Sequence, residues 1–341
     1  MTKKIKILQI GAGSMGTRRL RDLSQRNDVD IAVFDLRNDR REKVEKNFSV
    51  PSFDNLEDAL SWNPEALIIS TPPEQHKEYI RLALDMRLHH FCEEHIWTYD
   101  CDEIELISSA NNLVSASSCS FHFLPIVIGL KKIVKKKLGN LHCYQMLLST
   151  CMRQWHPEEG SAFYARKRQT AAAREMVPFE LIYLNDIFGQ AHEVSGMVGC
   201  CGDSEENPED IWNLQMRLQN NAYGQLTVLQ GAPANERRGL CIGENGKVVF
   251  DIRKGTINLT LNNSPVENLN FGTVGEVIED TYNKEINTFV EAVKGKVEWP
   301  LSYQQSSVAT ATLAAMEKSA ITGKREMVDY LTQPAFLPCD Y

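Results

Sequence analysis

The amino-acid sequence predicts an α/β protein in two domains: a doubly wound parallel sheet, then an α+β domain with an open, mostly antiparallel sheet. The first domain is indicated by strand-like and helix-like runs that alternate through the first third of the chain, as βαβ units require. The second is indicated by strand-like runs that follow one another across short turns after about residue 190. A length of 341 residues suits two domains, which we place at residues 1–121 and 122–341.

Composition narrows the class of protein. Hydrophobic residues make up 43% of the chain and charged residues 24%, which is ordinary for a globular protein. A net charge of −8 gives no general attraction to nucleic acid or anionic membranes, and no apolar stretch is long enough to cross a bilayer. The nine cysteines include no CxxC pair and no metal-like spacing. We therefore expect a cytoplasmic protein with free thiols and no bound metal.

A glycine triplet lies near the start of the chain, in the segment Gly11-Ala12-Gly13-Ser14-Met15-Gly16. The run before it is typical of a strand, and residues 17–23 after it are typical of a helix. In this setting Gly11 permits a tight turn, Gly13 lets the backbone approach a pyrophosphate, and Gly16 lets helix and strand pack closely. Free N–H groups at the helix start would face the phosphates. The segment predicts a Rossmann dinucleotide-binding loop; the alternative is a glycine-rich turn that binds no nucleotide.

The second expected strand, residues 30–34, ends in Asp35, which lies nineteen residues after Gly16. An acid at this place would bond a ribose 2′-hydroxyl and repel a 2′-phosphate, which favours NAD over NADP. Three basic residues follow closely and could accept such a phosphate: Arg37, Arg40 and Arg41. NADP therefore stays open as the second choice of cofactor.

The rest of the first half continues the alternation. The expected helices cover residues 40–48 and 56–62, the second capped by Asn55, and another opens at 74–76; the expected strands cover residues 66–69, 89–92 and 113–120. Because the carboxyl ends of parallel strands line the ligand crevice, the residues that follow 66–69 are candidates to contact the dinucleotide. They are Ser70, Thr71 and Pro72, and Glu93-Glu94-His95 follows the next strand.

In the second half the pattern changes from alternating units to a run of strands. Helices are expected at residues 124–137 and 170–188, the second with Pro178 inside it, which predicts a kink or a late start. Strands are expected at residues 141–152, 193–199, 211–218, 224–229, 240–242, 247–251 and 256–261. Asn245-Gly246 predicts a tight hairpin between two of them.

Several of these motifs together resemble the Gfo/Idh/MocA family of sugar and polyol dehydrogenases. They are Gly11 to Gly16, Ser70-Thr71-Pro72 with His76, and Cys92-Glu93. The resemblance continues through residues 121–125 and through the helices expected at 285–290 and 306–321. Trp155-His156-Pro157 with residues 164–167 resembles a branch often associated with surface-polysaccharide sugars.

The resemblance implies an NAD(P)-dependent oxidoreductase with a small, sugar-like substrate. It also implies that the open sheet forms the interface of a homodimer or homotetramer. The cofactor contacts that it adds to the glycine segment and Asp35 fall on Arg37, Ser70, Thr71, Pro72, His76, Glu93 and Glu94.

The chain departs from the family where the chemistry is expected. Family members usually carry Glu-Lys-Pro where this sequence has Glu93-Glu94-His95, so the lysine position is Glu94. The ending Ile187-Phe188-Gly189 sets the register of the substrate helix and places the family's histidine on Phe179, while the following Glu180 is retained. The arginine often found at the entrance to the second domain is His122.

A hydroxyl that loses a hydride must also lose a proton, and neither the lysine nor the histidine is present to accept it. We therefore take Glu94, Tyr183 and His122 as catalytic candidates. Burial would raise the pKa of a carboxyl group at the Glu94 position and make it a usable base, although a loop carboxylate is an equal alternative. Tyr183 lies one helical turn after Phe179, where a core tyrosine is the alternative. The candidate substrate residues are His95, Trp155, Arg166, Phe179 and Glu180.

Three functions remain open from the sequence. The leading one is hydride transfer between a nicotinamide and a sugar, sugar acid or nucleotide sugar. The second is a dinucleotide-binding sensor or partner subunit without dehydrogenase chemistry, which the joint loss of lysine and histidine suggests. The third is a protein that keeps its cofactor tightly bound and cycles its oxidation state internally, as some family relatives do.

Overall fold

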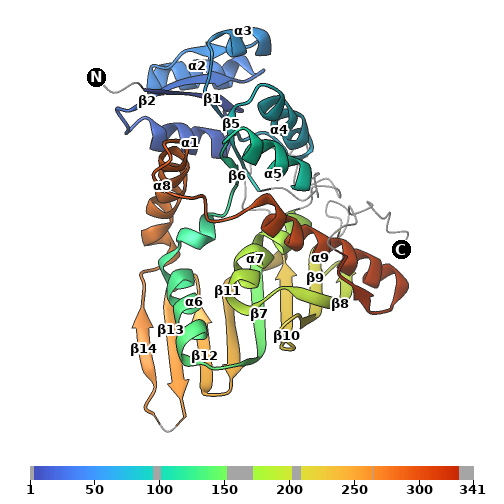
Figure 1. Ribbon diagram of the computed structural model, residues 1–341. Helices are drawn as coiled ribbons and strands as arrows, with labels where there is room; N and C mark the ends of the chain where they lie inside the picture. Colours follow the sequence, from blue (N-terminus) through green and yellow to red (C-terminus); the bar gives the residue numbers. More distant parts are fainter. Residues whose placement is uncertain (1–3, 95–100, 152–171, 202–208, 263, 330–341) are drawn as a thin grey trace. The chain divides into compact units, whose positions relative to one another are not determined.

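The computed structural model describes residues 4–94, 101–151, 172–201, 209–262 and 264–329 (Figure 1). These residues fall into two compact units. The first holds residues 4–94, 101–120 and 280–306, and the second holds the other described residues. The first unit thus takes in a late segment of the chain. The division into domains at residue 121 stays a prediction about which parts fold on their own.

A parallel sheet forms the centre of the first unit, as predicted, with the strand order β3-β2-β1-β4-β5-β6. Its strands are β1 (Ile5–Ile10), β2 (Val29–Phe34), β3 (Ser52–Phe53), β4 (Ala66–Ile69), β5 (His89–Cys92) and β6 (Ser115–Ser117). The direction of winding reverses between β1 and β4. In doubly wound sheets the ligand crevice opens at this reversal, outside the carboxyl ends of the strands.

Helices connect these strands. They are α1 (Ser14–Leu23), α2 (Asn38–Phe48), α3 (Leu56–Ser61), the short 3-10 helix η1 (Pro73–Gln75), α4 (His76–Asp85) and α5 (Cys101–Ala110). The predicted cap of α3 is confirmed, because the Asn55 side chain accepts hydrogen bonds from the backbone N–H groups of Glu57 and Asp58. Such a cap contributes about 1 kcal/mol to helix stability.

The helix α8 (Val274–Val293) supplies the first unit with apolar residues from late in the chain. Its Ile286, Phe289 and Val290 are fully buried in one core cluster with Leu20 of α1 and Phe91 of β5. Residues this far apart in sequence meet only after the chain returns to the first sheet. The core of the first unit therefore depends on residues beyond 280.

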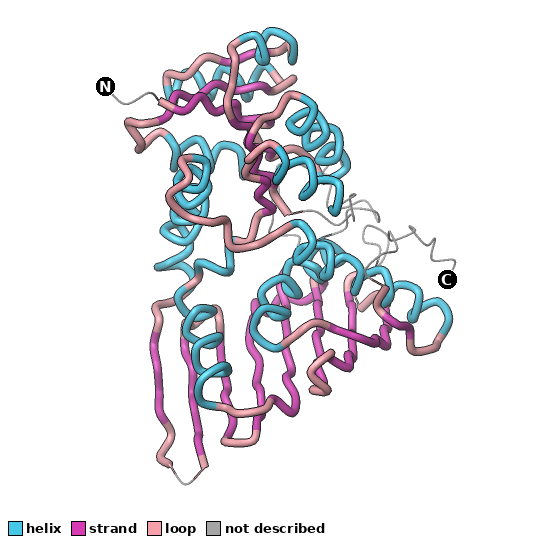
Figure 2. The backbone as a smooth tube through the Cα atoms, in the orientation of Figure 1, coloured by secondary structure: helices cyan, strands magenta, loops and turns pink. Residues whose placement is uncertain are grey.

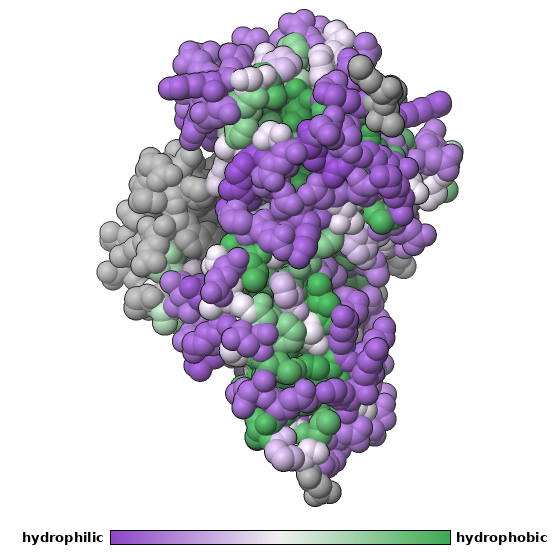
Figure 3. Space-filling view, turned by 90° about the vertical axis from the view of Figure 1, so that its left-hand side faces the viewer, coloured by the Kyte–Doolittle hydropathy of each residue, from purple (hydrophilic) through white to green (hydrophobic). Residues whose placement is uncertain are grey.

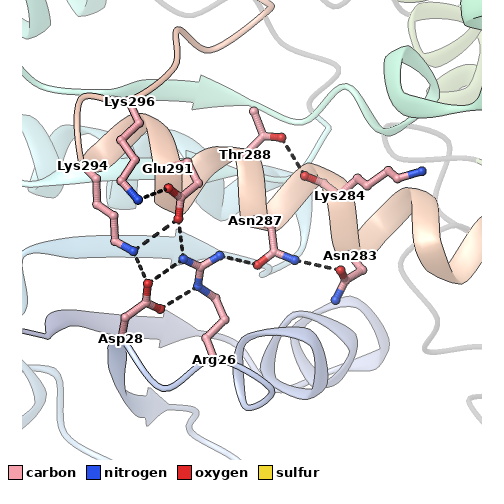
Figure 4. Close-up of polar contacts among 9 residues, drawn as sticks. All are labelled: Arg26, Asp28, Asn283, Lys284, Asn287, Thr288, Glu291, Lys294 and Lys296. Atoms are coloured by element: carbon pink, nitrogen blue, oxygen red, sulfur yellow. Dashed lines mark hydrogen bonds and ion pairs between the residues drawn. The ribbon is translucent and has the colours of Figure 1, made fainter.

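A polar cluster fastens the end of α8 to the turn before β2 (Figure 4). Arg26 pairs with Asp28 over 2.9 Å and with Glu291 over 2.5 Å. Lys294 contacts both of these carboxylates, and Lys296 lies 2.7 Å from Glu291. The cluster therefore cross-links two segments of the first unit through alternating charges.

The last strand of the first sheet is shorter than predicted, since β6 covers only Ser115–Ser117 and a 3-10 helix, η2 (Ser120–Phe123), follows. The Ser118 and Ser120 hydroxyls and the Cys119 backbone N–H donate to the buried carboxylate of Glu285. These groups point to a side chain of α8 and not along a strand ladder, which explains why the strand ends there.

The second unit is built on a mixed sheet with the order β14-β13-β12-β11-β7-β10-β9-β8-β15. Among the described strands only the β7–β10 pair is parallel, so the predicted open, mostly antiparallel sheet is confirmed. Its strands are β7 (Leu141–Cys151), β8 (Ala191–Gly199), β9 (Ile211–Leu218), β10 (Tyr223–Leu229), β11 (Gly231–Gly243), β12 (Gly246–Asp251), β13 (Thr256–Leu261), β14 (Glu267–Asn270) and β15 (Glu326–Met327). The hairpin predicted at Asn245-Gly246 joins β11 to β12.

Three helices lie on one face of this sheet, α6 (Pro125–Lys137), α7 (Ala172–Phe188) and α9 (Tyr303–Thr322) (Figures 1 and 2). The buried ion pair of Arg174 and Glu317, with nitrogen and oxygen 2.6 Å apart, links α7 to α9.

In the space-filling view, hydrophilic side chains cover most of the visible face and hydrophobic ones form patches between them (Figure 3). Among the described residues, no helix is long and apolar enough to cross a membrane.

Three strands of the second sheet differ from the expectation, and in the first sheet the short β3 was not expected. β11 begins at Gly231 and not at Leu240, and it pairs with β7 across an irregularity between Gly231 and Glu236. The polar residues in this stretch hide its strand character from a hydrophobicity pattern. β14 and β15 are short and polar edge strands that the pattern also misses.

Candidate functional site

The glycine segment forms a cradle that leaves no room for a side chain at Gly11 or Gly16. Gly11 has φ +83°, and a Cβ atom there would lie 2.7 Å from the carbonyl oxygen of Ser70. A Cβ atom on Gly16 would lie 2.0 Å from the carbonyl oxygen of Gly11. Gly13 precedes α1, whose start has no side-chain cap and whose first turn has no acidic residue. The N–H groups at this helix start therefore suit a phosphate anion, as the sequence motif predicts.

Asp35 is held at the end of β2 by the backbone. Its carboxylate accepts hydrogen bonds from the N–H groups of Ala12, over 2.7 Å, and Arg37, over 2.8 Å. The Arg40 guanidinium lies 3.7 Å from the same carboxylate, whereas the Arg37 side chain pairs with Asp39. The carboxylate keeps lone pairs that could accept ribose hydroxyls. The geometry fits the adenosine half of a dinucleotide.

A buried histidine, His76, holds the segment after β4 in place. His76 is buried, and burial lowers the pKa of its ring to about 4. The ring is therefore neutral near pH 7, and its Nε2 lies 2.9 Å from the Thr71 carbonyl oxygen, which accepts the hydrogen bond. His76 thus positions Thr71 next to Ser70 and Pro72. Direct contact of His76 with a cofactor stays a prediction.

Glu93 follows β5 and takes part in a buried ion cluster. Arg19 of α1 donates to both of its carboxylate oxygens, over 2.8 and 2.9 Å, and the Ser70 hydroxyl donates to one of them over 3.2 Å. Arg19 also pairs with Glu285 of α8 over 2.8 Å. Glu94, the next residue, is buried as well. The motif search missed Arg19 and Glu285, although Arg19 lies only three residues after Gly16.

In the second unit, Phe179 and Tyr183 of α7 pack against Phe121. The Phe121 ring lies 5.1 Å from that of Phe179, edge to face, and 5.5 Å from that of Tyr183. The guanidinium of Arg237 on β11 covers the Phe121 ring at 4.5 Å. On the face of α7 where the family's histidine would lie, there are thus aromatic rings, and the Arg237 guanidinium packs against this aromatic cluster. Sequence reasoning missed Arg237 because β11 is longer than its hydrophobic pattern indicates.

Glu180 is fully buried between two polar partners. One of its oxygens lies 2.8 Å from the guanidinium of Arg237, and the other accepts the hydroxyl of Tyr183. Burial raises the pKa of the Glu180 carboxyl group despite the opposing effects of Arg237 and Tyr183. Burial and the neighbouring carboxylate raise the pKa of the Tyr183 phenol well above its usual range. The phenol therefore stays protonated near neutrality, as a hydrogen-bond donor to Glu180.

His122 also has its partner within the second unit. Its Nε2 lies 3.4 Å from a carboxylate oxygen of Asp186, which Lys131 contacts over 2.5 Å. Burial raises the pKa of Asp186, but the bonds from His122 and Lys131 outweigh burial and lower it to about 2. The imidazole of His122 thus lies beside a carboxylate that stays ionised near neutral pH.

The remaining predicted substrate residues, His95, Trp155 and Arg166, lie outside the described residues. Within the described part of the chain, no group of three or more histidine, cysteine, aspartate or glutamate residues is arranged to hold a metal ion.

The first unit has the sheet order, the glycine cradle and the acidic residue after β2 that define an NAD-binding Rossmann domain. Residues 5–110 match the family model described as the oxidoreductase family with an NAD-binding Rossmann fold, Gfo/Idh/MocA. Over these residues the match confirms the resemblance to that family, whose description names an NAD-binding fold.

Comparison with individual proteins supports the fold over nearly the whole chain. The crystal structure of GenD2 from gentamicin A biosynthesis, in complex with NAD, has a TM-score of 0.81 and 18% identity, covering 96% of this chain and 97% of that one. Myo-inositol 2-dehydrogenase from Lactobacillus plantarum has a TM-score of 0.80 and 19% identity, covering 96% and 100%. At such identities the likeness concerns the fold.

A curated relative matches part of the sequence. Glucose-6-phosphate 3-dehydrogenase of Bacillus subtilis (strain 168) is 30% identical over 144 residues, which is 41% of this chain and 40% of that protein. The matched stretch thus spans less than half of the curated relative.

Proposed function

We propose that this protein is an NAD-dependent dehydrogenase that acts on a CH–OH group of a sugar, a sugar acid or a nucleotide sugar. The observation that carries the proposal is the glycine cradle beside Asp35, where a Cβ atom at Gly11 or Gly16 would collide with backbone. The substrate class is supported by the curated relative, whose name describes a sugar-phosphate dehydrogenase, and by the inositol dehydrogenase among the similar structures.

Glu94 is our candidate for the group that accepts the proton of the substrate hydroxyl. Bound NAD supplies the hydride acceptor, at C4 of its nicotinamide. The carbinol carbon loses its hydrogen as hydride, the hydroxyl oxygen forms the carbonyl, and the hydroxyl proton passes to the Glu94 carboxylate. Glu94 is buried directly after β5, at the edge where ligands of such sheets bind, and burial favours a carboxyl group that can hold a proton.

Tyr183 and His122 remain further candidates with a narrower role. Each already contacts a carboxylate of its own unit, Glu180 and Asp186 respectively. We propose that these two pairs shape and polarise the substrate side and that Glu94 exchanges the proton. Phe179, Glu180, His95, Trp155 and Arg166 stay our candidates for substrate contacts.

The first test is a titration of the purified protein with NAD, followed by a screen of sugars, sugar acids and nucleotide sugars for NADH formation. On the best substrate, Glu94→Gln should lower kcat by about 10²- to 10⁴-fold, because a positioned general base contributes that much. The matched control is Glu45→Gln, an exposed residue at the end of α2, the helix that leads into the start of β3, and it should leave kcat unchanged. Unchanged turnover in Glu94→Gln would remove Glu94 from the mechanism.

The second candidate function is dinucleotide binding without dehydrogenase chemistry, as in a sensor or partner subunit. The observation in its favour is the aromatic cluster of Phe121, Phe179 and Tyr183. On this face of α7, none of these side chains accepts or releases a proton near neutral pH. Turnover of any sugar with added NAD would eliminate it. A nucleotide that survives purification would instead indicate a cofactor that is recycled in place.

We further propose that the protein forms a homodimer or homotetramer through the open face of its second sheet. Large apolar side chains are exposed on strands of this sheet: Met197, Tyr223, Ile242 and Val249. A hollow of about 330 Å³ on the same sheet is lined by Gln145, Gln215 and Tyr223 among others. We take these four exposed apolar side chains as the part of the face that a second copy of the chain covers. Light scattering after size-exclusion chromatography should show an oligomer that Tyr223→Glu dissociates.

We also propose that the protein is located in the cytoplasm.

A further inference from the structure

A guanidinium group, that of Arg237, lies beside the face of α7 on which we predict substrate contacts. Arg237 pairs in register with Leu148 of β7, and its side chain lies on the helix-covered face of the sheet, because it reaches Glu180 of α7 over 2.8 Å. The guanidinium carbon lies 4.5 Å from the centre of the Phe121 ring and 5.8 Å from that of Phe179. Since Phe179 is at the position of the family's histidine, a cation lies next to that position in this chain.

The pair of Arg237 and Glu180 can be compared with a second buried pair of the same kind in this unit. Arg174 donates through Nε and Nη2 to both carboxylate oxygens of Glu317, and neither side chain is more than 5% exposed. Arg237 instead reaches one oxygen of Glu180 through Nη2, and the other oxygen accepts the Tyr183 hydroxyl. The Arg237 side chain is 16% exposed, and its Nε has no hydrogen-bond partner among the described residues. Arg237 thus keeps a donor unsatisfied where Arg174 does not.

The chemistry of this donor narrows what can complete it. A guanidinium has five N–H donors and no acceptor, so its further partner must supply oxygen lone pairs. Its charge and planar fork favour a carboxylate or a phosphate over a neutral hydroxyl. Stacking on Phe121 and the contact with Glu180 fix the plane of the group before a ligand arrives. Burial raises the pKa of the Glu180 carboxyl group, so protonation of Glu180 costs less when a second anion approaches the guanidinium.

We propose that Arg237 is a specificity residue that binds an anionic group of the substrate, a carboxylate or a phosphate. The substrate is then a sugar acid or a sugar that bears phosphate, as a nucleotide sugar does, and not a neutral sugar or polyol. The inference rests on the proposed dehydrogenase function and names the substrate class of the same site.

The test measures the dissociation constants of glucose, glucuronate and glucose 6-phosphate for the protein saturated with NAD, by isothermal titration calorimetry at one pH and salt concentration. These sugars share one ring and carry, respectively, no charge, a carboxylate and a phosphate. In the native protein we expect at least one anionic sugar to bind about tenfold more tightly than glucose, as for a hydrogen bond between ionised groups. The tighter of the two anionic sugars identifies the group that Arg237 binds.

Two variants at the pair isolate the role of the guanidinium. Arg237→Lys keeps a positive charge beside Glu180 but loses the planar fork, and it should reduce the preference for the anionic sugar several-fold. Arg237→Met/Glu180→Gln removes both charges together and keeps an acceptor for the Tyr183 hydroxyl. In this double variant the anionic sugar should bind no more tightly than glucose. The control is Arg238→Lys, because Arg238 is exposed and alternates to the other face of β11, and it should show native affinities.

The outcomes separate this inference from the proposed function. Equal affinity for glucose and the anionic sugars in the native protein, or binding of neither anionic sugar, would overturn the inference while NAD binding stands. A parallel loss of all three sugars in Arg237→Lys, with their ratio unchanged, would show that Arg237 only supports the fold, and the inference would be wrong. If the native protein does not bind NAD, the proposed function itself fails.

Discussion

The backbone N–H of Ala12 donates to the carboxylate of Asp35 across 2.7 Å, which joins the glycine segment after β1 to the end of β2. The same carboxylate receives the N–H of Arg37. Asp35 is therefore both a candidate for the ribose hydroxyls and a brace for the glycine loop, our candidate for the phosphates. Its charge would also repel a 2′-phosphate.

Replacing Asp35 should change which cofactor the protein accepts. In Asp35→Ser the repulsion is removed, and Arg40, which lies 3.7 Å from the carboxylate in the native protein, becomes available to a phosphate. We expect the affinity for NADP to rise relative to that for NAD by about tenfold or more, as for a new Arg–phosphate contact. Fluorescence titration with both cofactors measures this ratio. Asp85→Ser, at the exposed end of α4, should leave it unchanged.

Substituting the third glycine should disable the cradle. A Cβ atom at Gly16 would lie 2.0 Å from the Gly11 carbonyl oxygen, so Gly16→Ala must push α1 away from β1. We expect about 1–3 kcal/mol of destabilisation from the overpacking and a loss of NAD affinity of at least about tenfold. Urea unfolding and NAD titration report the two effects. In the control, Gly275→Ala, the nearest atom to the new Cβ is 4.0 Å away, and native NAD affinity is expected.

The buried pair of Arg174 and Glu317 should be costly to break on one side only. Arg174→Met leaves the Glu317 carboxylate buried without its ion-pair partner, which we expect to cost about 3–5 kcal/mol in the free energy of unfolding. The double variant Arg174→Met/Glu317→Leu should regain much of this loss, since no charge stays buried. Equal destabilisation of the single and double variants in urea would contradict this explanation.

Acid should weaken the cluster at the end of α8. Hydrogen bonds from Lys296 and Arg26 lower the pKa of Glu291 from 4.5 to about 2. A carboxyl group whose pKa is depressed by folding stabilises the protein fully above its unfolded pKa, and the contribution is lost as the pH falls from about 5 toward 2. Tm falls between pH 6 and pH 3. Because the group is partly exposed, we expect this fall to be smaller in Glu291→Gln than in the native protein, by only about 2 °C. High salt should reduce the difference.

The sequence allows the fold class to be predicted because its signals are local. The glycine segment, the apolar run of β4 and the cap at Asn55 each depend on residues a few positions apart, and the structure confirms them. Short spacing fixes a turn or a helix start whatever the rest of the chain does. The same is true of the hairpin at Asn245-Gly246.

The partners of the candidate site could not be predicted in this way. Arg19 and Glu285 meet across 266 positions of sequence, and Arg237 reaches Glu180 from a strand whose polar residues disguise it. Contacts of this kind depend on which faces the folded chain brings together, and no periodicity records them. The short length of β6 has the same origin, because its polar groups turn toward Glu285.

The late segment 280–306 of the first unit has a consequence for biosynthesis. When a ribosome has released the six strands of the first sheet, the chain still lacks Glu285, the partner of the buried Arg19, and Phe289, which packs on Phe91. While more than 150 further residues are translated, Arg19 has only Glu93 as its ion-pair partner, and the apolar surface that Phe289 covers stays exposed. The first unit can therefore complete its core only after residue 290 has been synthesised.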